Sequence, residues 1–485
     1  MKSLFFFIIS PLLVFSQFFE SNLPIIVINT NGNDIVDEPR ILCDMGIINN
    51  GLGEINCLTD SFTDYNGKIS IEIRGSTSQN FPKKSYALET QDLKGNNNNV
   101  SLLNMPSEND WILYAPYSDK SLMRNFLIFY LGNKLGRYNT RTKYCELVIN
   151  GDYKGIYILM EKIKRDNNRV DIAKLNKNDI SGDDLTGGYI IKIDKFSSTT
   201  DKYWISNYNT IGGDQLYFQY HYPKYVDMSH EQRDYIRYFI DDFENSLYGK
   251  HFSDTIIGYA NYIDISSFVD FYIINEFAKN IDGYRLSTFM YKDKSSNGGK
   301  LIMGPLWDYN LAFGNAEYCS GWNTSGWQQD GSCFDLAGVP FWFERLLEDT
   351  TYQNTLKCRW YYLRQSVLKQ EKLLNFIDSI SYHLDDAMKR NFERWDILGT
   401  NVTPNYFVGK NYDEEIFFLK NWIIERLTWM DENIPPCNSG RTITTFNKKL
   451  AVTVDVLGRA SRKNKHHSLL YIYYPGNVYK QVITH

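Results

Sequence analysis

The sequence predicts an α+β protein of two lobes, with a β-rich first half, a helical second half and a small β-rich module at the C-terminus. Residues 68–75 alternate apolar and polar side chains as a half-buried strand does, whereas residues 230–247 and 264–280 repeat apolar side chains at helical spacing. The 485 residues are 43% hydrophobic and 22% charged, as in ordinary globular proteins. An aromatic content of 15% excludes a disordered, collagen-like or coiled-coil chain.

Strand signals dominate the first half of the chain. Helix 118–136 is the exception, with Ser118 as its candidate N-cap and Gly136 at its end. Residues 145–163 predict a hairpin that turns at Asn150–Gly151. The remaining predicted strands are 23–30, 68–75, 187–194 and 214–220.

Helical signals dominate the second half. After the two predicted helices 230–247 and 264–280, residues 287–293 and 299–308 predict two strands, and residues 336–433 are mostly helical in pattern. The tail returns to strands at 450–456 and 468–474. The change from strands to helices along the chain predicts two lobes with a cleft between them.

The N-terminal residues have the pattern of a secretory signal peptide over residues 1–16. One Lys precedes an apolar run from Leu4 to Phe15, and Val14 and Ser16 fit cleavage before Gln17. The run is short for a membrane span, although an N-terminal anchor remains the alternative. No second run of 18 apolar residues follows, so we expect no stable membrane span.

The charge of the chain is unevenly distributed. Residues 441–485 contain eight Lys and Arg and one acid, Asp455, so this tail carries +7 and residues 1–440 carry −12, which together give the net charge of −5. The break predicts a boundary near 438–441, and Pro435–Pro436 favours a linker over residues 435–440. A net charge of −5 gives no general case for nucleic-acid binding.

Seven cysteines are present, and their spacing does not favour a zinc site, since no CxxC pair occurs and no histidines cluster with them. In an oxidising compartment, Cys43–Cys57 and Cys319–Cys333 are candidate local disulfides. The alternative is that all seven cysteines are reduced and buried.

Two aspartates are the first candidates for chemistry, because the Walker, GxGxxG, GxSxG and HExxH motifs are all absent. Asp282 directly follows helix 264–280, and Asp308 ends strand 299–308. A hairpin between them would bring both to one edge of the cleft, where one carboxylate orients an attacking hydroxyl and the other holds Mg²⁺ on phosphates. The alternative is that both are ordinary turn residues.

Basic residues and one glutamate are the other candidates. The turn that follows strand 68–75 supplies Arg74, Lys83 and Lys84, with hydroxyl residues between them. Such a set can bind phosphates, and the alternative is a solvated basic turn without a ligand. Glu161 ends an apolar strand. Three roles are open for it: it accepts a hydrogen bond from an adenine amine, it forms an ion pair with a Lys, or it is an exposed residue at the end of the strand.

Six segments taken in order resemble the CotH-type kinase family, over roughly residues 24–430. They are RGSTSQNFPKKSY (74–86), WILYAPYSDKSLMRN (111–125), NGDYKGIYILMEKI (150–163), TGGYIIKID (186–194), NEFAKNIDGYRLSTFMYKD (275–293) and GPLWDYNLAFG (304–314). The resemblance implies a divergent protein-kinase-like fold and transfer of phosphate from ATP to serines of secreted or coat proteins, with Mg²⁺ as the metal.

The resemblance also implies roles for the candidate residues. Asp282 would be the catalytic Asp and Asp308 the Mg²⁺ ligand. The nucleotide would be contacted by Arg74, by Lys83 or Lys84, by Glu161 and by Trp307. The chain departs from typical protein kinases at Ser287, because an Asn usually stands five residues after the catalytic Asp. Asn310 is a candidate replacement on the metal side, and a pseudokinase remains open.

The tail carries a separate resemblance, through VDVLGR (454–459) and YIYYPGNVYK (471–480), to C-terminal sorting domains of bacterial type IX secretion. It implies export through the secretion machinery, with a terminal binding module as the alternative.

The sequence therefore predicts a secreted atypical protein kinase that phosphorylates Ser or Thr of an exported or surface protein. A non-catalytic surface scaffold or adhesin is the alternative. The predicted domains are a signal peptide (1–16), a strand-rich segment (17–67), a kinase-like domain (68–434), a linker (435–440) and a sorting-like domain (441–485).

Overall fold

The computed structural model describes residues 20–195, 202–330, 333 and 338–437, together with three short strands nearer the C-terminus. The chain divides into two compact units, each of which is described by itself. The barrel unit takes the residues up to Ala115, Lys143–Leu159 and His383–Asp396. The helical unit takes Pro116–Thr142, Met160–Tyr382 and the residues from Ile397 onward.

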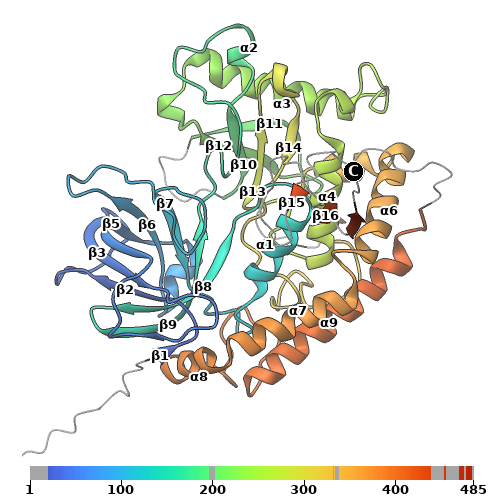
Figure 1. Cartoon of the computed structure of the whole chain (residues 1–485). Helices are drawn as coiled ribbons and strands as arrows, with labels where there is room; N and C mark the ends of the chain where they lie inside the picture. The colour runs from blue at the N-terminus through green and yellow to red at the C-terminus, as the bar shows by residue number, and fades with distance from the viewer. Residues whose placement is uncertain are drawn as a thin grey trace, which may run out of the picture. The chain divides into compact units, whose positions relative to one another are not determined.

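The barrel unit is built on a closed barrel of seven strands in the order β2-β3-β5-β6-β7-β9-β8 (Figure 1). Its inward side chains, among them Ile28, Met45 and Trp111, are almost fully buried and form one apolar core, as alternation along the strands requires. The strands are β2 (Ile25–Asn29), β3 (Ile41–Ile48), β5 (Tyr65–Arg74), β6 (Ser85–Gln91), β7 (Asp110–Tyr114), β8 (Thr142–Ile149) and β9 (Asp152–Glu161). A short pair, β1 (Glu20–Ser21) and β4 (Asn56–Cys57), accompanies them.

Helix α8 (Asp385–Arg394) belongs to the barrel unit although it lies far along the chain. Arg390 of α8 forms an ion pair of 2.8 Å with the fully buried Glu146 of β8. The indole of Trp395, just after the helix, donates to the carbonyl of Lys154 at 2.8 Å. These polar bonds fix the helix to the β8–β9 hairpin.

The helical unit contains a five-stranded antiparallel sheet in the order β11-β12-β10-β13-β14. Its strands are β10 (Tyr189–Ile193), β11 (Tyr203–Asn209), β12 (Gln215–Tyr222), β13 (Thr288–Lys292) and β14 (Leu301–Met303). Helix α4 (Ile265–Ala278) is buried on nearly all sides, which explains why its sequence is apolar around the whole helix. The other helices are α1 (Arg124–Lys134), α2 (Gly182–Leu185), α3 (His230–Tyr248), α5 (Trp342–Leu346), α6 (Thr350–Gln365), α7 (Gln370–His383) and α9 (Tyr412–Asn433).

The predicted β-rich first half and helical second half are confirmed, but the division between the units differs from the predicted lobes. Strands β10, β11 and β12 lie in the helical unit, where they share one sheet with β13 and β14 of the second half and β10 pairs with β13. The periodicity of a strand identifies the strand but not the sheet that it joins.

Two predicted elements near the candidate site are wrong at one end. Helix α1 begins at Arg124 rather than at Ser118, because the buried Asp119 accepts from the backbone N–H of Arg124 at 2.8 Å and holds residues 118–123 as a loop. Strand β14 ends at Met303 instead of 308, because Pro305 has no N–H to donate to a neighbouring strand. Asp308 therefore lies in a loop.

The disulfide predictions are half right. Cys319–Cys333 is confirmed, with Cα atoms 4.7 Å apart. Cys43–Cys57 is wrong, since both thiols are free and Cys43 is buried in the barrel core. A pair that the sequence did not indicate, Cys358–Cys437, spans 79 residues.

Several predictions fall outside the described residues. They include the signal peptide (1–16), most of the linker and most of the tail. In the tail, the strands β15 (Thr453–Val454), β16 (Leu469–Tyr474) and β17 (Asn477–Val482) form an antiparallel sheet, in which β15 and β16 correspond to predicted strands. The domain boundaries and the sorting role stay predictions.

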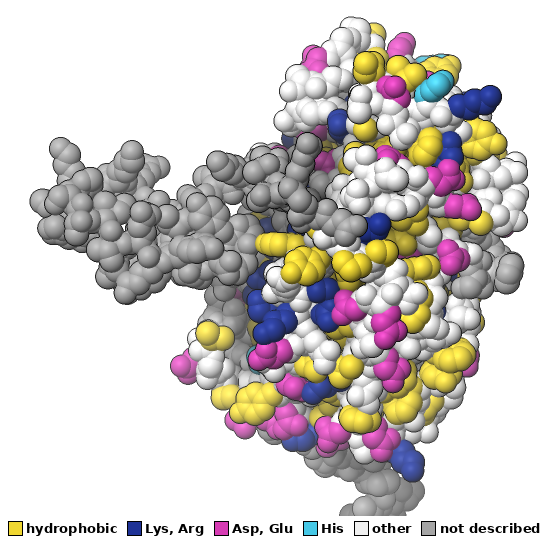
Figure 2. All heavy atoms as spheres, turned by 90° about the vertical axis from the view of Figure 1, so that its right-hand side faces the viewer, with side chains coloured by type: hydrophobic (Ala, Val, Ile, Leu, Met, Phe, Trp, Pro, Cys, Tyr) yellow, Lys and Arg dark blue, Asp and Glu magenta, His cyan; other side chains and the backbone are white. Residues whose placement is uncertain are grey.

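No helix in the described ranges has both the length and the apolar composition that crossing a bilayer requires. On the face shown in Figure 2, basic, acidic and hydrophobic side chains are interspersed. Such mixing is typical of a protein surface that faces water.

Candidate functional site

Helix α4 positions the segment that carries Asp282. The side chain of Asp264 caps the start of the helix by accepting from the backbone N–H of Ser267 at 2.7 Å. The helix ends at Ala278, and the next residue, Lys279, has a left-handed φ of 43°, as at many helix C-termini. The chain then turns through Asn280 to Asp282 and Arg285, before β13 begins at Thr288.

Asn280 joins the segment that carries Asp282 to the segment that carries Asp308. Its side-chain oxygen accepts from the backbone N–H of Asp282 at 3.4 Å, and its side-chain nitrogen donates to the backbone carbonyl of Asp308 at 3.3 Å. Asn280 is only 2% exposed, so this amide is fixed in place. The antiparallel pair β13–β14 thus brings the chain back as the sequence predicted, and the segments of Asp282 and Asp308 meet.

The carboxylate of Asp282 is oriented by Arg285. The side chain of Asp282 is 18% exposed and forms an ion pair of 3.3 Å with the guanidinium of Arg285, which is itself 3% exposed. The Nε of Arg285 donates to the carbonyl of Ile281 at 2.9 Å, which fixes the guanidinium beside the carboxylate. A carboxylate held in this way, with one edge toward solvent, is suited to accept a proton from a hydroxyl.

Asp308 is exposed, and the residue after it anchors its loop. The backbone N–H of Tyr309 donates to Asn125 of α1 at 2.7 Å, and its hydroxyl donates to Asn275 of α4 at 2.9 Å. Asp308 has a φ of 64°, in the left-handed region that non-glycine residues seldom adopt. The buried Tyr309 thus keeps Asp308 at the surface.

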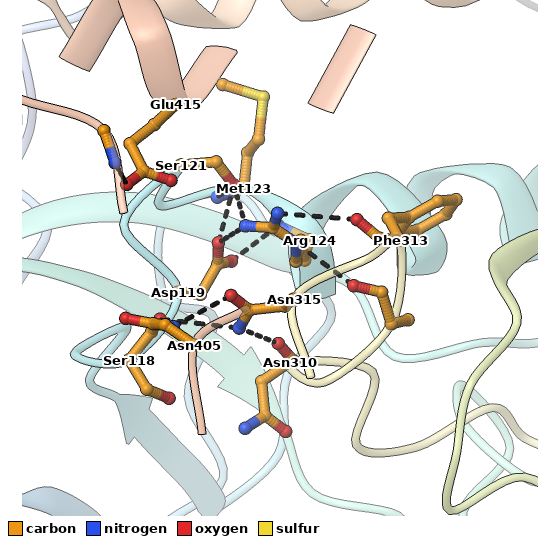
Figure 3. Close-up of polar contacts among 12 residues, drawn as sticks. Ser118, Asp119, Ser121, Met123, Arg124, Asn310, Phe313, Asn315, Asn405 and Glu415 are labelled. Atoms are coloured by element: carbon orange, nitrogen blue, oxygen red, sulfur yellow. Dashed lines mark hydrogen bonds and ion pairs between the residues drawn. The ribbon is translucent and has the colours of Figure 1, made fainter. Parts of the chain in front are cut away.

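The loop that follows Asp308 is held by a buried polar network (Figure 3). Arg124 of α1 is paired with Asp119 at 2.6 Å, and its Nε donates to the carbonyl of Ala312 at 3.1 Å. The side-chain nitrogen of Asn315 donates to the backbone carbonyl of Asn310 at 2.8 Å. The side chain of Asn310 points away from this network (Figure 3).

Asp308 and Asn310 fit a Mg²⁺ site of the kind that includes phosphate oxygens. In the described part of the chain, no group of three or more His, Cys, Asp or Glu could hold a metal by itself. Mg²⁺ in phosphoryl-transfer sites commonly takes only one or two protein oxygens and completes its octahedron with phosphates and water. The carboxylate of Asp308 and the amide oxygen of Asn310 are donors of that type.

Glu161 is fully buried in the helical unit, so the interpretation of this residue as an exposed strand end is wrong. Its carboxylate pairs with the guanidinium of Arg141 at 2.8 Å and lies 3.8 Å from that of Arg169. The backbone N–H of Arg141 also donates to it at 3.0 Å. The ion-pair partners of Glu161 among the described residues are arginines, and no Lys is among them.

Trp307 is half-buried on the loop before Asp308. Its ring lies 6.1 Å from that of Phe129 and 6.3 Å from that of Phe289, between centroids. These contacts hold the indole beside the segment that carries Asp308, in the helical unit.

The three basic candidates lie in the barrel unit and have different surroundings. Lys83 is 2% exposed, and its Nζ donates to the carbonyl of Ile156 at 2.6 Å and to Asn391 of α8 at 2.8 Å. Burial lowers the pKa of Lys83 to about 7. Lys84 is half-buried and donates to the carbonyl of Gln79 within the β5–β6 turn, which begins directly after Arg74.

Sequence reasoning missed Asn280, Arg285 and Asn125. Asn280 stands two residues before Asp282 and Arg285 stands three residues after it, so short spacing from a candidate aspartate was a usable signal. Asn125 lies 184 residues from Tyr309, and no local pattern indicates that contact.

Comparison with known protein families gives one match. Residues 71–430 match the family described as CotH kinase protein, and this range includes every candidate site residue. No curated protein matches the chain. Since the matched range is well over half of the sequence, the chain belongs to the CotH kinase family.

Proposed function

We propose that the protein transfers the γ-phosphoryl group of ATP to a Ser or Thr hydroxyl of an exported or surface protein. Membership of a kinase family supports the reaction class. The observation that carries the assignment of residues is the Asn280 amide, which joins the segment of Asp282 to that of Asp308. Two carboxylates on adjacent segments are what phosphoryl transfer requires, one for the nucleophile and one for the metal.

In this mechanism Asp282 acts on the acceptor. Its carboxylate, oriented by Arg285, accepts a hydrogen bond from the hydroxyl and takes the proton as the oxygen–phosphorus bond forms. The bond between the γ-phosphorus and its bridging oxygen breaks, and ADP leaves. Asp308 and Asn310 would hold Mg²⁺, which would supply charge neutralisation to the phosphates.

The nucleotide contacts are shared among the remaining candidates. We assign the phosphate contact to Lys84 and Arg74 at the β5–β6 turn, because Lys84 is only half-buried whereas Lys83 is 2% exposed. Trp307 supplies an aromatic face for the base. Glu161 acts through Arg141, since its own carboxylate is fully buried.

Calorimetric titration with Mg²⁺–ATP and a phosphate-transfer assay on a Ser-containing acceptor protein test the proposal together. We expect Asp308→Ala to abolish Mg²⁺-dependent nucleotide binding, and Asp282→Asn to retain ATP affinity while transfer falls by about 10²-fold or more. Asp396→Asn, at an exposed aspartate of the barrel unit, is the matched control and should change neither. Full Mg²⁺–ATP affinity in Asp308→Ala would contradict the metal assignment.

A non-catalytic scaffold is the second candidate, and one feature favours it. Ser287 stands where protein kinases usually have a metal-binding Asn. Mg²⁺–ATP binding without transfer by the wild-type protein would support a pseudokinase. Absence of nucleotide binding together with tight binding to a surface partner would support an adhesin.

The proposed setting is outside the cytoplasm. The signal-like pattern of residues 1–16 and the sorting-like segments of the tail support export. Fractionation of cells that express the full chain and a variant without residues 441–485 tests this part separately, because it needs no activity.

A further inference from the structure

The Cys319–Cys333 disulfide closes a loop that packs on the end of helix α4. We call residues 319–333 the disulfide loop; the structure describes residues 319–330 and 333 of it. Cys333 is 8% exposed and Cys319 is half-buried, so the pair lies at the border of the protein surface. The loop contacts α4 at the turn from which Asp282 emerges.

The backbone of the disulfide loop satisfies two charged groups, Glu276 of α4 and Lys279 directly after the helix. The N–H groups of Gln328 and Gln329 donate to the fully buried carboxylate of Glu276 at 2.7 and 2.9 Å. The ammonium group of Lys279 donates to the carbonyls of Asn323, at 2.9 Å, and Ser325. Lys279 directly precedes Asn280, so these bonds fix the start of the segment that carries Asp282.

Arg426 of helix α9 ties the same parts together. Its Nε donates to the carbonyl of Glu276 at 2.8 Å, and one terminal nitrogen donates to the carbonyls of Thr324 and Gly326 at 2.9 and 2.7 Å. The guanidinium is fully buried and lies 3.4 Å from the Glu276 carboxylate. If the disulfide loop moves, these buried charges lose their partners, which is costly.

Arg285 connects the disulfide directly to Asp282. The same terminal nitrogen of Arg285 contacts the sulfur of Cys333 at 3.2 Å and the carboxylate of Asp282 at 3.3 Å. Arg285 is 3% exposed, so the position of its guanidinium depends on these neighbours together with the carbonyl of Ile281, to which its Nε donates at 2.9 Å. The disulfide thus forms one wall of the site that orients the Asp282 carboxylate.

We infer that the Cys319–Cys333 disulfide is a redox-sensitive positioning element for Asp282, and that its reduction releases Arg285 and lowers phosphate transfer. The inference rests on the proposed function, since it assumes that Asp282 acts on the acceptor hydroxyl. The disulfide thus makes phosphate transfer fast in compartments where disulfides persist and slow where a dithiol reduces them.

The chemical step is thiol–disulfide exchange with a dithiol. A thiolate of the reductant attacks one sulfur, the bond between Cys319 and Cys333 breaks, and a mixed disulfide forms. The second thiol of the reductant resolves it, so that the reductant ends as a cyclic disulfide and the protein as two thiols. Once the cross-link is open, the loop gains conformational freedom.

The first experiment compares two double variants of the full chain. Cys319→Ser/Cys333→Ser removes the inferred element, and Cys358→Ser/Cys437→Ser removes the other disulfide as the matched control. We expect kcat to fall at least tenfold in the former, with KM for ATP changed less than threefold, and the control to keep the wild-type kcat. Equal loss in both variants, or no loss in the former, would overturn the inference.

Variants of Arg285 test the link without touching the cysteines. Arg285→Lys keeps a cation and should retain more than a third of the wild-type kcat. Arg285→Met should lose at least tenfold, and its residual activity should no longer respond to a dithiol. A dithiol response of wild-type size in Arg285→Met would show that the disulfide acts by another route.

Hydrogen exchange separates failure of this inference from failure of the kinase assignment. The backbone amides of residues 280–286 should exchange at least tenfold faster in the dithiol-reduced protein than in the oxidised protein, whether or not it transfers phosphate. Faster exchange without any transfer by the oxidised protein would refute the proposed function but retain the positioning element. Unchanged exchange on reduction would refute the positioning element itself.

Discussion

Replacement of Asn280 is the most direct perturbation of the candidate site, since its amide bridges the segments of Asp282 and Asp308. The two hydrogen bonds measure 3.4 and 3.3 Å, at the long end for N–H···O bonds, so each contributes about 0.5–1 kcal/mol net. Asn280→Ala should therefore lower the free energy of unfolding by about 1–2 kcal/mol. A shift of either aspartate by about 1 Å should cost about 10²-fold in kcat.

Asn280→Asp refines this test because it changes only one of the two bonds. The carboxylate still accepts from the N–H of Asp282, but it places an oxygen against the carbonyl of Asp308, where repulsion replaces a bond. We therefore expect weaker Mg²⁺–ATP binding in Asn280→Asp, since the Asp308 side is the one disturbed.

The assays are kcat, the Kd for Mg²⁺–ATP and the free energy of unfolding by denaturant. Asn56→Ala is the matched control, because Asn56 is a 1% exposed asparagine of the barrel unit that donates to the carbonyls of Ser21 and Leu23. It should lose similar stability and keep kcat. If Asn280→Ala loses stability but keeps kcat within threefold, the bridge is structural and the reasoning is refuted.

Three further predictions concern pH, the two lysines and the tail. Burial raises the pKa of Glu244 from its ordinary value of 4.5 to about 7. The contribution of Glu244 to stability is therefore full below pH 4.5 and is lost as the pH rises through 7. Glu244→Gln should remove about 3 kcal/mol of this pH dependence, measured as the difference in the free energy of unfolding by denaturant between pH 5 and pH 8. Lys84→Met should raise the KM for ATP at least tenfold and Lys83→Met should change it less than threefold, and the reverse order in steady-state kinetics would exchange their roles. Removal of residues 441–485 should leave Mg²⁺–ATP affinity unchanged in calorimetry but stop export, and secretion of the truncated chain would leave the tail as a binding module.

Glutamine suits the test at Glu244 because of the two donors that surround the carboxylate. The hydroxyl of Ser206 donates to it at 2.6 Å and the indole of Trp342 at 2.9 Å. A glutamine oxygen still accepts from Trp342, and its amide nitrogen donates to the Ser206 hydroxyl instead. The variant thus removes the titration without leaving a buried polar atom unpaired.

The secondary structure followed from the sequence wherever periodicity was strong. The strand at 68–75 and the helix at 264–280 are confirmed, although α4 is buried on nearly all sides rather than along one face. The closure of seven strands into a barrel was not predictable, since β8 pairs in parallel with β2, more than 100 residues earlier in the chain. Strand pairing over such distances leaves no local signal.

The wrong predictions share one physical cause, which is a tertiary contact that overrides a local preference. Ser118 has the chemistry of an N-cap, yet its carbonyl accepts from Asn405 at 2.7 Å and the chain becomes helical only at Arg124. Cys43 and Cys57 are close in sequence, yet Cys43 points into the barrel core. Local sequence supplies the candidates for capping and for cross-linking, and packing selects among them.

The candidate site itself shows why its residue types were predictable and its geometry was not. Twelve non-glycine residues of the described chain have left-handed φ, and seven of these lie between Lys279 and Ser320, Asp308 among them. Such conformations are unfavourable for these residue types and persist only where surrounding contacts impose them. Here the contacts come from distant residues, such as Asn125 on Tyr309 and Arg426 on the disulfide loop. The sequence marks Asp282 and Asp308 as carboxylates in polar turns, but their joint position depends on buried polar side chains that resemble ordinary core residues until the fold is known.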